Sequence, residues 1–266
     1  MITVSFMTAN YVARPVGYRM TEGWMQGDNA TNDFFRPLDT YAERLGLYCS
    51  DIRAMGFTAL DIWMPLLNPV WATPDHVRIA REVLARYGLS VNSLAGWFGA
   101  TAVEFDACCK LAVALNCQVL GGGTGLLEHD RAQVVHLLRD YGLRLGLENH
   151  PEKTPAEMLA KIGDGAGGVI GTAVDTGWYG TQGYDAADAL RELAPHLIHV
   201  HLKDVRAPGG HETCRYGAGC VPVQRCVETL RQIGYDGPLC VEHEPELFDP
   251  TEDCIASLAL LKGWLT

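Results

Sequence analysis

Short apolar runs alternate with amphipathic stretches along the whole chain. The apolar runs are rich in Val, Ile and Leu and predict strands at Ile2–Ala9, Phe57–Ile62, Leu89–Leu94, Gln118–Gly121, Leu143–Glu148, Val169–Asp175, Leu197–Leu202 and Leu239–Glu242. The stretches between them predict helices at Leu38–Met55, Pro74–Tyr87, Thr101–Leu115, Arg131–Tyr141, Pro155–Ile162, Tyr184–Leu193, Pro222–Ile233 and Asp253–Trp264. Two of these begin with a capping hydroxyl followed by proline, at Thr73-Pro74 and Thr154-Pro155.

Eight strand–helix pairs with no break in composition predict an α/β fold, a single-domain (β/α)₈ TIM barrel over residues 1–266. A doubly wound open sheet remains the alternative, because alternation alone does not prove closure. Two segments are too long for ordinary loops, Asn10–Pro37 and Asp204–Val221. Both follow strands, so in a barrel both fall on the C-terminal face, where active sites are built.

Composition narrows the classes of function. The 266 residues are 48% hydrophobic and carry 21 Lys+Arg against 32 Asp+Glu, a net charge of −11 that disfavours nucleic-acid partners. No apolar run approaches the ~18 residues that a membrane span needs. Met1–Tyr11 reads as a strand rather than a secretion signal. The nine scattered cysteines predict reduced, mostly buried thiols and a cytoplasmic location.

Four consecutive predicted strands end on groups that bind metals. Glu148, Asp175 and His201 close the fifth, sixth and seventh strands at intervals of 27 and 26 residues, about one β-α unit each, and Glu242 closes the eighth. In a barrel these four side chains point to one place above the mouth. Each alone would be read as a strand cap that meets solvent. All four together predict one divalent metal site, because three converging carboxylates repel one another without a cation.

Three carboxylates and one imidazole form an oxygen-rich site. Such a site suits Mn²⁺ best, with Mg²⁺, Co²⁺ or Zn²⁺ as alternatives, since structural zinc favours thiolates. Cys214, Cys220 and Cys226 recur every six residues, but zinc sites usually show tighter pairs.

The strand-end motifs resemble those of a known family. Leu-Gly-Leu-Glu148-Asn-His, Ala-Val-Asp175-Thr-Gly, His-Val-His201-Leu-Lys-Asp and Gly-Pro-Leu-Cys-Val-Glu242-His-Glu are similar to motifs of the sugar phosphate isomerase/epimerase group of xylose isomerase-like barrels. The resemblance covers nearly the whole chain. It implies that Glu148 and Glu242 both touch the metal and act as the acid/base pair, with Asp175 and His201 as further ligands.

One position departs from the family pattern. Many relatives carry a histidine three residues after the sixth-strand aspartate, where it contacts substrate or a further metal, and here that residue is Trp178. The departure weakens any transfer of substrate preference. It also argues against the trinuclear zinc site of the related abasic-site endonucleases, a phosphodiesterase reading that would need more ligands and a basic groove.

The site supports proton transfer next to a carbonyl. A divalent ion can polarise an α-hydroxy ketone and stabilise its enediolate, while Glu148 and Glu242 remove and return a proton. We therefore expect a metal-dependent isomerase or epimerase of a small sugar or related polyhydroxy ketone. A metal-dependent lyase or dehydratase that acts on an inosose or keto-glycoside with the same site is the alternative, and a non-catalytic sugar-binding barrel is a further one. Homo-oligomerisation is left open.

Other polar and aromatic residues are predicted near the mouth. His150, Trp178, Arg206, His211 and Glu244 are candidates for substrate binding. His199, two residues before His201, is expected to be a hydrogen-bonded core histidine. Two or more of Trp24, Trp63, Trp97 and Trp178 are expected to wall the pocket, and Gly121–Gly125 is expected to form a tight turn below the substrate.

Overall fold

Eight parallel strands close into a barrel in the computed structural model, which describes residues 2–266. The barrel order is β1 (Val4–Met7), β10 (Leu239–Val241), β7 (Leu197–Leu202), β6 (Ile170–Asp175), β5 (Arg144–Glu148), β4 (Val119–Gly123), β3 (Ser90–Trp97) and β2 (Ala59–Trp63). Strand β1 completes the ring, because Ser5 pairs with Ala59 of β2 on one side and with Cys240 of β10 on the other. The predicted closed barrel is confirmed, and the open sheet is excluded.

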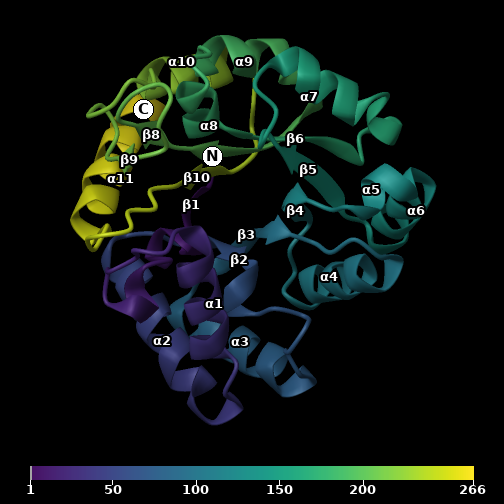
Figure 1. Ribbon diagram of the computed structural model, residues 1–266, viewed down its shortest axis with the longest axis vertical. Coiled ribbons are helices and arrows are strands. Elements are labelled where there is room, and N and C mark those ends of the chain that lie inside the picture. The colour runs from purple at the N-terminus through teal and green to yellow at the C-terminus, as the bar shows by residue number, and fades with distance from the viewer. Residues whose placement is uncertain (1) are drawn as a thin grey trace.

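Helices surround the strands (Figure 1). They are α2 (Leu38–Ala54), α3 (Pro74–Tyr87), α4 (Ala102–Ala114), α6 (Arg131–Tyr141), α7 (Pro155–Ile162), α9 (Ala186–Glu192), α10 (Val223–Gln232) and α11 (Thr251–Leu265), with the short α5 (Leu126–His129) and α8 (Thr176–Thr181). Helices α3, α6 and α7 have the predicted bounds. Their ends are sharp because caps mark them: Thr154 Oγ1 accepts the Glu157 N–H at 3.3 Å, and Gly88 and Gly142 end α3 and α6 in left-handed conformations.

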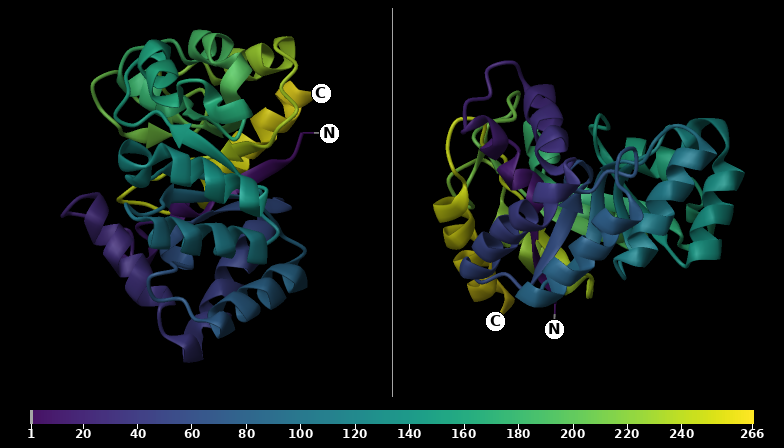
Figure 2. Two further views of the ribbon diagram at one scale, coloured as in Figure 1. Left: turned by 90° about the vertical axis from the view of Figure 1, so that its right-hand side faces the viewer. Right: turned by 90° about the horizontal axis from the view of Figure 1, so that it is seen from below.

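The two long segments hold structure that the hydrophobic pattern did not predict. Asn10–Pro37 contains helix α1 (Trp24–Phe35), which lies at the end of the barrel away from the chain termini (Figure 2). Asp204–Val221 contains the antiparallel pair β8 (Asp204–Val205) and β9 (Thr213–Cys214). The buried Asp204 carboxylate folds this segment back on itself, because it accepts N–H groups from Gly217, Gly219 and Val221 at 2.9–3.1 Å.

The core is continuous around the barrel. Apolar side chains from strands and helices pack in one cluster that includes the fully buried Phe6, Leu120, Leu145 and Val200. All nine cysteines are free thiols, and all but Cys220 are buried. No helix among residues 2–266 combines the length and apolar character that crossing a membrane requires.

Candidate metal centre and adjoining pocket

The carboxyl ends of β5, β6, β7 and β10 carry the four predicted ligands. Strand register places Asp175 beside His201, and His201 beside Cys240, two residues before Glu242. Side chains of consecutive loops tie these ends together. Asn149 exchanges hydrogen bonds with the backbone of Asp175 at 2.8 and 3.0 Å. Because Asn149 follows Glu148 directly, these two hydrogen bonds fix the position of Glu148 in space relative to Asp175.

The seam where the barrel closes is held in the same way. The Asn10 side-chain amide donates to the Val241 carbonyl at 3.1 Å and accepts the His243 N–H at 2.8 Å. Glu242 lies between those two residues, so a side chain from the first βα segment fixes the last predicted ligand.

Three of the four predicted ligands converge. Nδ1 of His201 lies 3.3 Å from Oε1 of Glu148 and 3.3 Å from Oε2 of Glu242. One donor atom from each of the three residues lies within 4.8 Å of the others. Oε2 of Glu242 is buried and has no hydrogen-bond partner in the described part of the chain. A buried carboxylate oxygen without a donor is costly, so this cluster has the character of a cation site.

Asp175 is engaged differently. Its Oδ1 accepts the backbone N–H groups of Gly177 and Trp178 at 2.7 and 3.1 Å, and its Oδ2 lies 2.9 Å from Nζ of Lys203. The structure therefore brings Asp175 to the edge of the cluster rather than into it. Lys203 is almost completely buried, and its Nζ also lies 3.1 Å from Oε1 of Glu242 and 2.9 Å from Oε2 of Glu244.

Neighbouring carboxylates favour the charged forms of the buried His201 and Lys203 side chains. Burial alone would lower the pKa of His201, but the carboxylates of Glu242 and Glu148 outweigh it and raise that pKa to about 10. Burial likewise opposes the Lys203 ammonium, yet Asp175, Glu242 and Glu244 raise its pKa well above the ordinary value. Burial raises the pKa of Glu242 well above its usual range, and Lys203 only partly offsets this.

A second buried cluster lies next to His201. Nε2 of His199 is 2.5 Å from Oδ2 of Asp61 on β2, and Nε2 of His201 is 3.8 Å from the same oxygen. The expectation of a hydrogen-bonded core histidine at His199 is confirmed. The sequence interpretation missed Asp61, although a carboxylate inside an otherwise apolar strand signals a buried partner. Burial would raise the pKa of Asp61, but the two histidines lower it to about 2.

The predicted substrate-binding residues separate into two groups. His150, Trp178 and His211 stack in series, with ring centroids 4.0 and 3.6 Å apart, and all three line the pocket together with Glu244. Arg206 is exposed, pairs with Glu212 at 3.2 Å and does not line the pocket.

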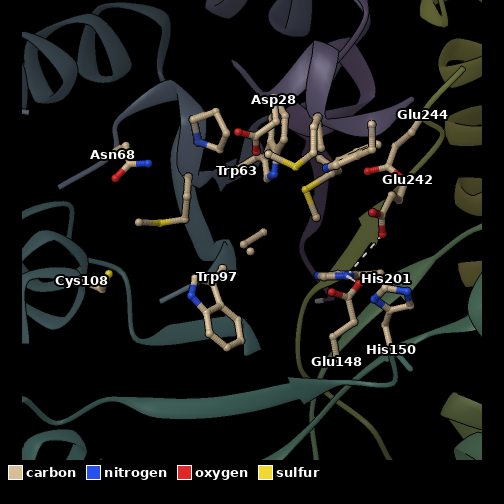
Figure 3. Close-up of a pocket in the computed structure, with 18 of the residues that line it drawn as sticks. Asp28, Trp63, Asn68, Trp97, Cys108, Glu148, His150, His201, Glu242 and Glu244 are labelled. Carbon is tan, nitrogen blue, oxygen red and sulfur yellow. Dashed lines mark hydrogen bonds and ion pairs between the residues drawn. The ribbon is translucent and has the colours of Figure 1, made fainter. Parts of the chain in front are cut away.

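One large cavity is lined both by the Glu148–His201–Glu242 cluster and by the predicted substrate-binding residues other than Arg206. Its volume is about 940 Å³, and Glu148, His201, Lys203, Glu242 and Glu244 form one end. All four tryptophans expected at the mouth, Trp24, Trp63, Trp97 and Trp178, line it. Figure 3 shows Trp97, Asn68 and Cys108 on the side opposite Glu148, His201 and Glu242, with open space between.

Comparison with known proteins identifies the family. A family model described as xylose isomerase-like TIM barrel matches residues 49–264, most of the chain. The resemblance predicted from the strand-end motifs is confirmed.

Curated relatives match shorter segments. An uncharacterised protein of Methanocaldococcus jannaschii is 29% identical over 142 residues, which are 50% of this chain and 46% of that protein. L-ribulose-5-phosphate 3-epimerase UlaE of Escherichia coli is 39% identical over 70 residues, 26% of this chain and 23% of that enzyme. The chain thus matches less than half the length of each of these relatives.

Solved structures share the fold at low identity. A xylose isomerase-like TIM barrel protein of Mycobacterium smegmatis in complex with magnesium has a TM-score of 0.73 at 17% identity, covering 100% of this chain and 97% of that one. The probable 3-DHS dehydratase AsbF of Bacillus anthracis has 0.68 at 12%, covering 98% and 99%. 3-Keto-D-glucoside 4-epimerase YcjR of E. coli has 0.66 at 18%, covering 99% and 100%.

Proposed function

We propose that this chain, which belongs to the xylose isomerase-like TIM barrel family, is a divalent-metal-dependent isomerase or epimerase of a sugar or related polyhydroxy ketone. The observation that supports this is the convergence of Glu148, His201 and Glu242 at one end of a deep cavity. We further propose a cytoplasmic, single-domain enzyme without a nucleic-acid partner.

The donor set fits a cation that prefers oxygen and imidazole ligands. Glu148, His201 and Glu242 would hold it, and the ion would give a partner to Oε2 of Glu242, which has no hydrogen-bond donor among the described residues. Asp175 is the proposed fourth ligand, reached through the oxygen that faces Lys203. Thiolates are absent from these described groups, so Mn²⁺ is the proposed ion, with Mg²⁺, Co²⁺ or Zn²⁺ as alternatives.

The bound ion would supply polarisation of the substrate carbonyl and stabilisation of the negative charge that follows C–H ionisation. The chain supplies the proton transfer. Glu148 and Glu242 each place a carboxylate oxygen 3.3 Å from Nδ1 of His201, and Figure 3 shows the two side chains coming to His201 from different directions, so a carbon held over the cluster would have both carboxylates in reach. Removal of a proton by one and return by the other inverts that carbon. Return to the neighbouring carbon interconverts an aldose and a ketose.

The names of two relatives share one chemical feature. In ribulose 3-epimerisation and in 3-ketoglucoside 4-epimerisation the carbon that inverts is adjacent to the ketone. This is the C–H that a carbonyl acidifies, and it supports a substrate in which a ketone stands next to a hydroxyl-bearing carbon.

Deuterium exchange tests the proposal. Purified protein loaded with Mn²⁺ is incubated in D₂O with a panel of ketoses and 3-keto-glycosides, and mass spectrometry and NMR follow the label. We expect one deuteron per turnover at the carbon beside the ketone, and a loss of about 100- to 10,000-fold in Glu148→Gln and in Glu242→Gln. Glu228→Gln, on the exposed face of α10, is the matched control. Full activity in both site variants would sink the proposal.

Elimination is the second candidate. The cavity extends well past the cluster, which leaves space for a leaving group on an inosose or a keto-glycoside. The same incubation separates the two, because a lyase or dehydratase releases water or an aglycone, whereas an epimerase or isomerase returns an intact isomer.

A further inference from the structure

The end of the cavity away from the Glu148–His201–Glu242 cluster carries exposed apolar side chains. Trp24, Met25, Val70, Trp97 and Val103 line it, and their exposed fractions are 38%, 59%, 84%, 61% and 79%. Exposed apolar side chains gathered in one concave patch mark a binding surface rather than ordinary surface residues. We call this end, bounded by those five residues, the apolar arm.

Trp97 is built as a flat platform. It ends β3, and a methyl group added at Gly123 or Gly125 would lie 3.6 or 3.2 Å from its ring. Two glycines from the β4 end therefore lie against the indole, while the ring remains largely exposed to the cavity. The absence of side chains at these positions of the Gly121–Gly125 segment allows the backbone to approach the Trp97 ring. Across the arm, Trp24 and Trp63 meet edge to face with centroids 5.3 Å apart.

The charges of the cavity exclude an anionic substituent. Lys203 is the only Lys or Arg among the described residues that line it, and its ammonium is already paired with Asp175, Glu242 and Glu244. Asp28 and Glu104 add carboxylates at the apolar arm. A phosphate there would meet negative charge and no free cation.

The geometry points to a subsite for an uncharged aromatic group carried by the substrate, such as the aglycone of an aryl keto-glycoside. This inference rests on the proposed function, because it assigns the reacting carbons to the Glu148–His201–Glu242 end. The arm is continuous with that end in one cavity, and 940 Å³ lies within the ~300–1,000 Å³ typical of small-ligand pockets. A ring stacked on Trp97 would fill the exposed face of the indole.

Binding without turnover tests the subsite. Isothermal titration calorimetry of the full chain with Mn²⁺ compares phenyl β-D-glucopyranoside with methyl β-D-glucopyranoside. We expect the phenyl glycoside to bind about 10- to 100-fold more tightly, since one buried aromatic ring contributes that much. Trp97→Ala should bring the ratio near one, and Trp97→Phe, which keeps a flat ring, should restore most of it.

Helix α4 offers a matched pair of controls. Val103 and Val113 are both exposed valines on this helix, but only Val103 lines the cavity. Val103→Gln should lower the preference for the phenyl glycoside, and Val113→Gln should leave it unchanged.

Two results would overturn the subsite. One is equal affinity for both glycosides, or no saturable binding of the phenyl glycoside. The other is a dimer in light scattering that Trp97→Ala converts to monomers, which would make the arm an interface between copies. Aryl preference without deuterium exchange on any ketone would contradict the proposed function alone, and exchange without aryl preference would contradict the subsite alone.

Discussion

Lys203 is a buried ammonium that contacts three carboxylates of the site, so its removal gives a sharp test of the electrostatics. Its Nζ lies 2.9 Å from Asp175, 3.1 Å from Glu242 and 2.9 Å from Glu244, and its side chain is 2% exposed. Lys203→Met keeps the length and apolar stem of the side chain and deletes only the charge. The three carboxylates then remain buried without this partner.

The size of the effect follows from those distances. A unit-charge pair at ~3 Å is worth about 5 kcal/mol at an effective dielectric constant of about 20. Two such pairs, with Asp175 and Glu244, already exceed the several kcal/mol that burial of one ammonium costs. Loss of one partner from a buried ion pair typically costs about 3–5 kcal/mol. We expect a decrease of that size in the free energy of unfolding of the metal-free protein.

Urea unfolding in EDTA, followed by far-UV circular dichroism, measures this decrease. Lys110→Met is the control, because Lys110 pairs with Asp106 at 2.7 Å on the exposed face of α4, and its removal should leave the unfolding midpoint unchanged. Mn²⁺ at about 100 times its Kd should return about 2.7 kcal/mol to the Lys203→Met protein. A metal-free variant within about 1 kcal/mol of the parent protein would refute the view that Lys203 holds these carboxylates together.

Two further predictions concern the histidines near the site. Asp61→Asn should weaken Mn²⁺ binding about 10- to 100-fold by calorimetry, because Asp61 lies against His199 and faces the far nitrogen of His201; unchanged affinity would mean that Asp61 only supports packing. Burial and the Lys203 charge lower the pKa of His211 to about 3. Between pH 6.5 and 3 the unfolded chain therefore binds a proton that the folded chain does not, and stability falls as the pH falls. Urea titrations at pH 7.5 and pH 5 measure this loss of unfolding free energy. The loss should be about 1–2 kcal/mol smaller in His211→Gln than in the parent protein. An identical pH dependence in the two proteins would contradict the assignment.

The sequence by itself determined the eight strand–helix units and the ends of the strands that carry the chemistry, whereas closure of the strands into a barrel was decided by the tertiary structure. Periodicity and capping residues are local, so α3, α6 and α7 begin and end at the predicted residues. The spacing of Glu148, Asp175 and His201 along the chain matches one β-α unit each, and parallel strands bring such positions to the same face.

Only the tertiary structure decided which of these groups touch. Asp61 and His199 are 138 residues apart and lie on strands that are not neighbours, so their contact depends on closure and stagger of the barrel. Lys203 follows His201 by two residues, so the sequence places both on the same face of the strand end. Which carboxylate Lys203 pairs with, Asp175 among them, depends on the packing of side chains across the mouth of the barrel. The apolar arm joins residues of α1, β3 and α4, which no local pattern connects. Strand ends are set by local sequence, whereas contacts across the mouth are set by the packing of the whole ring.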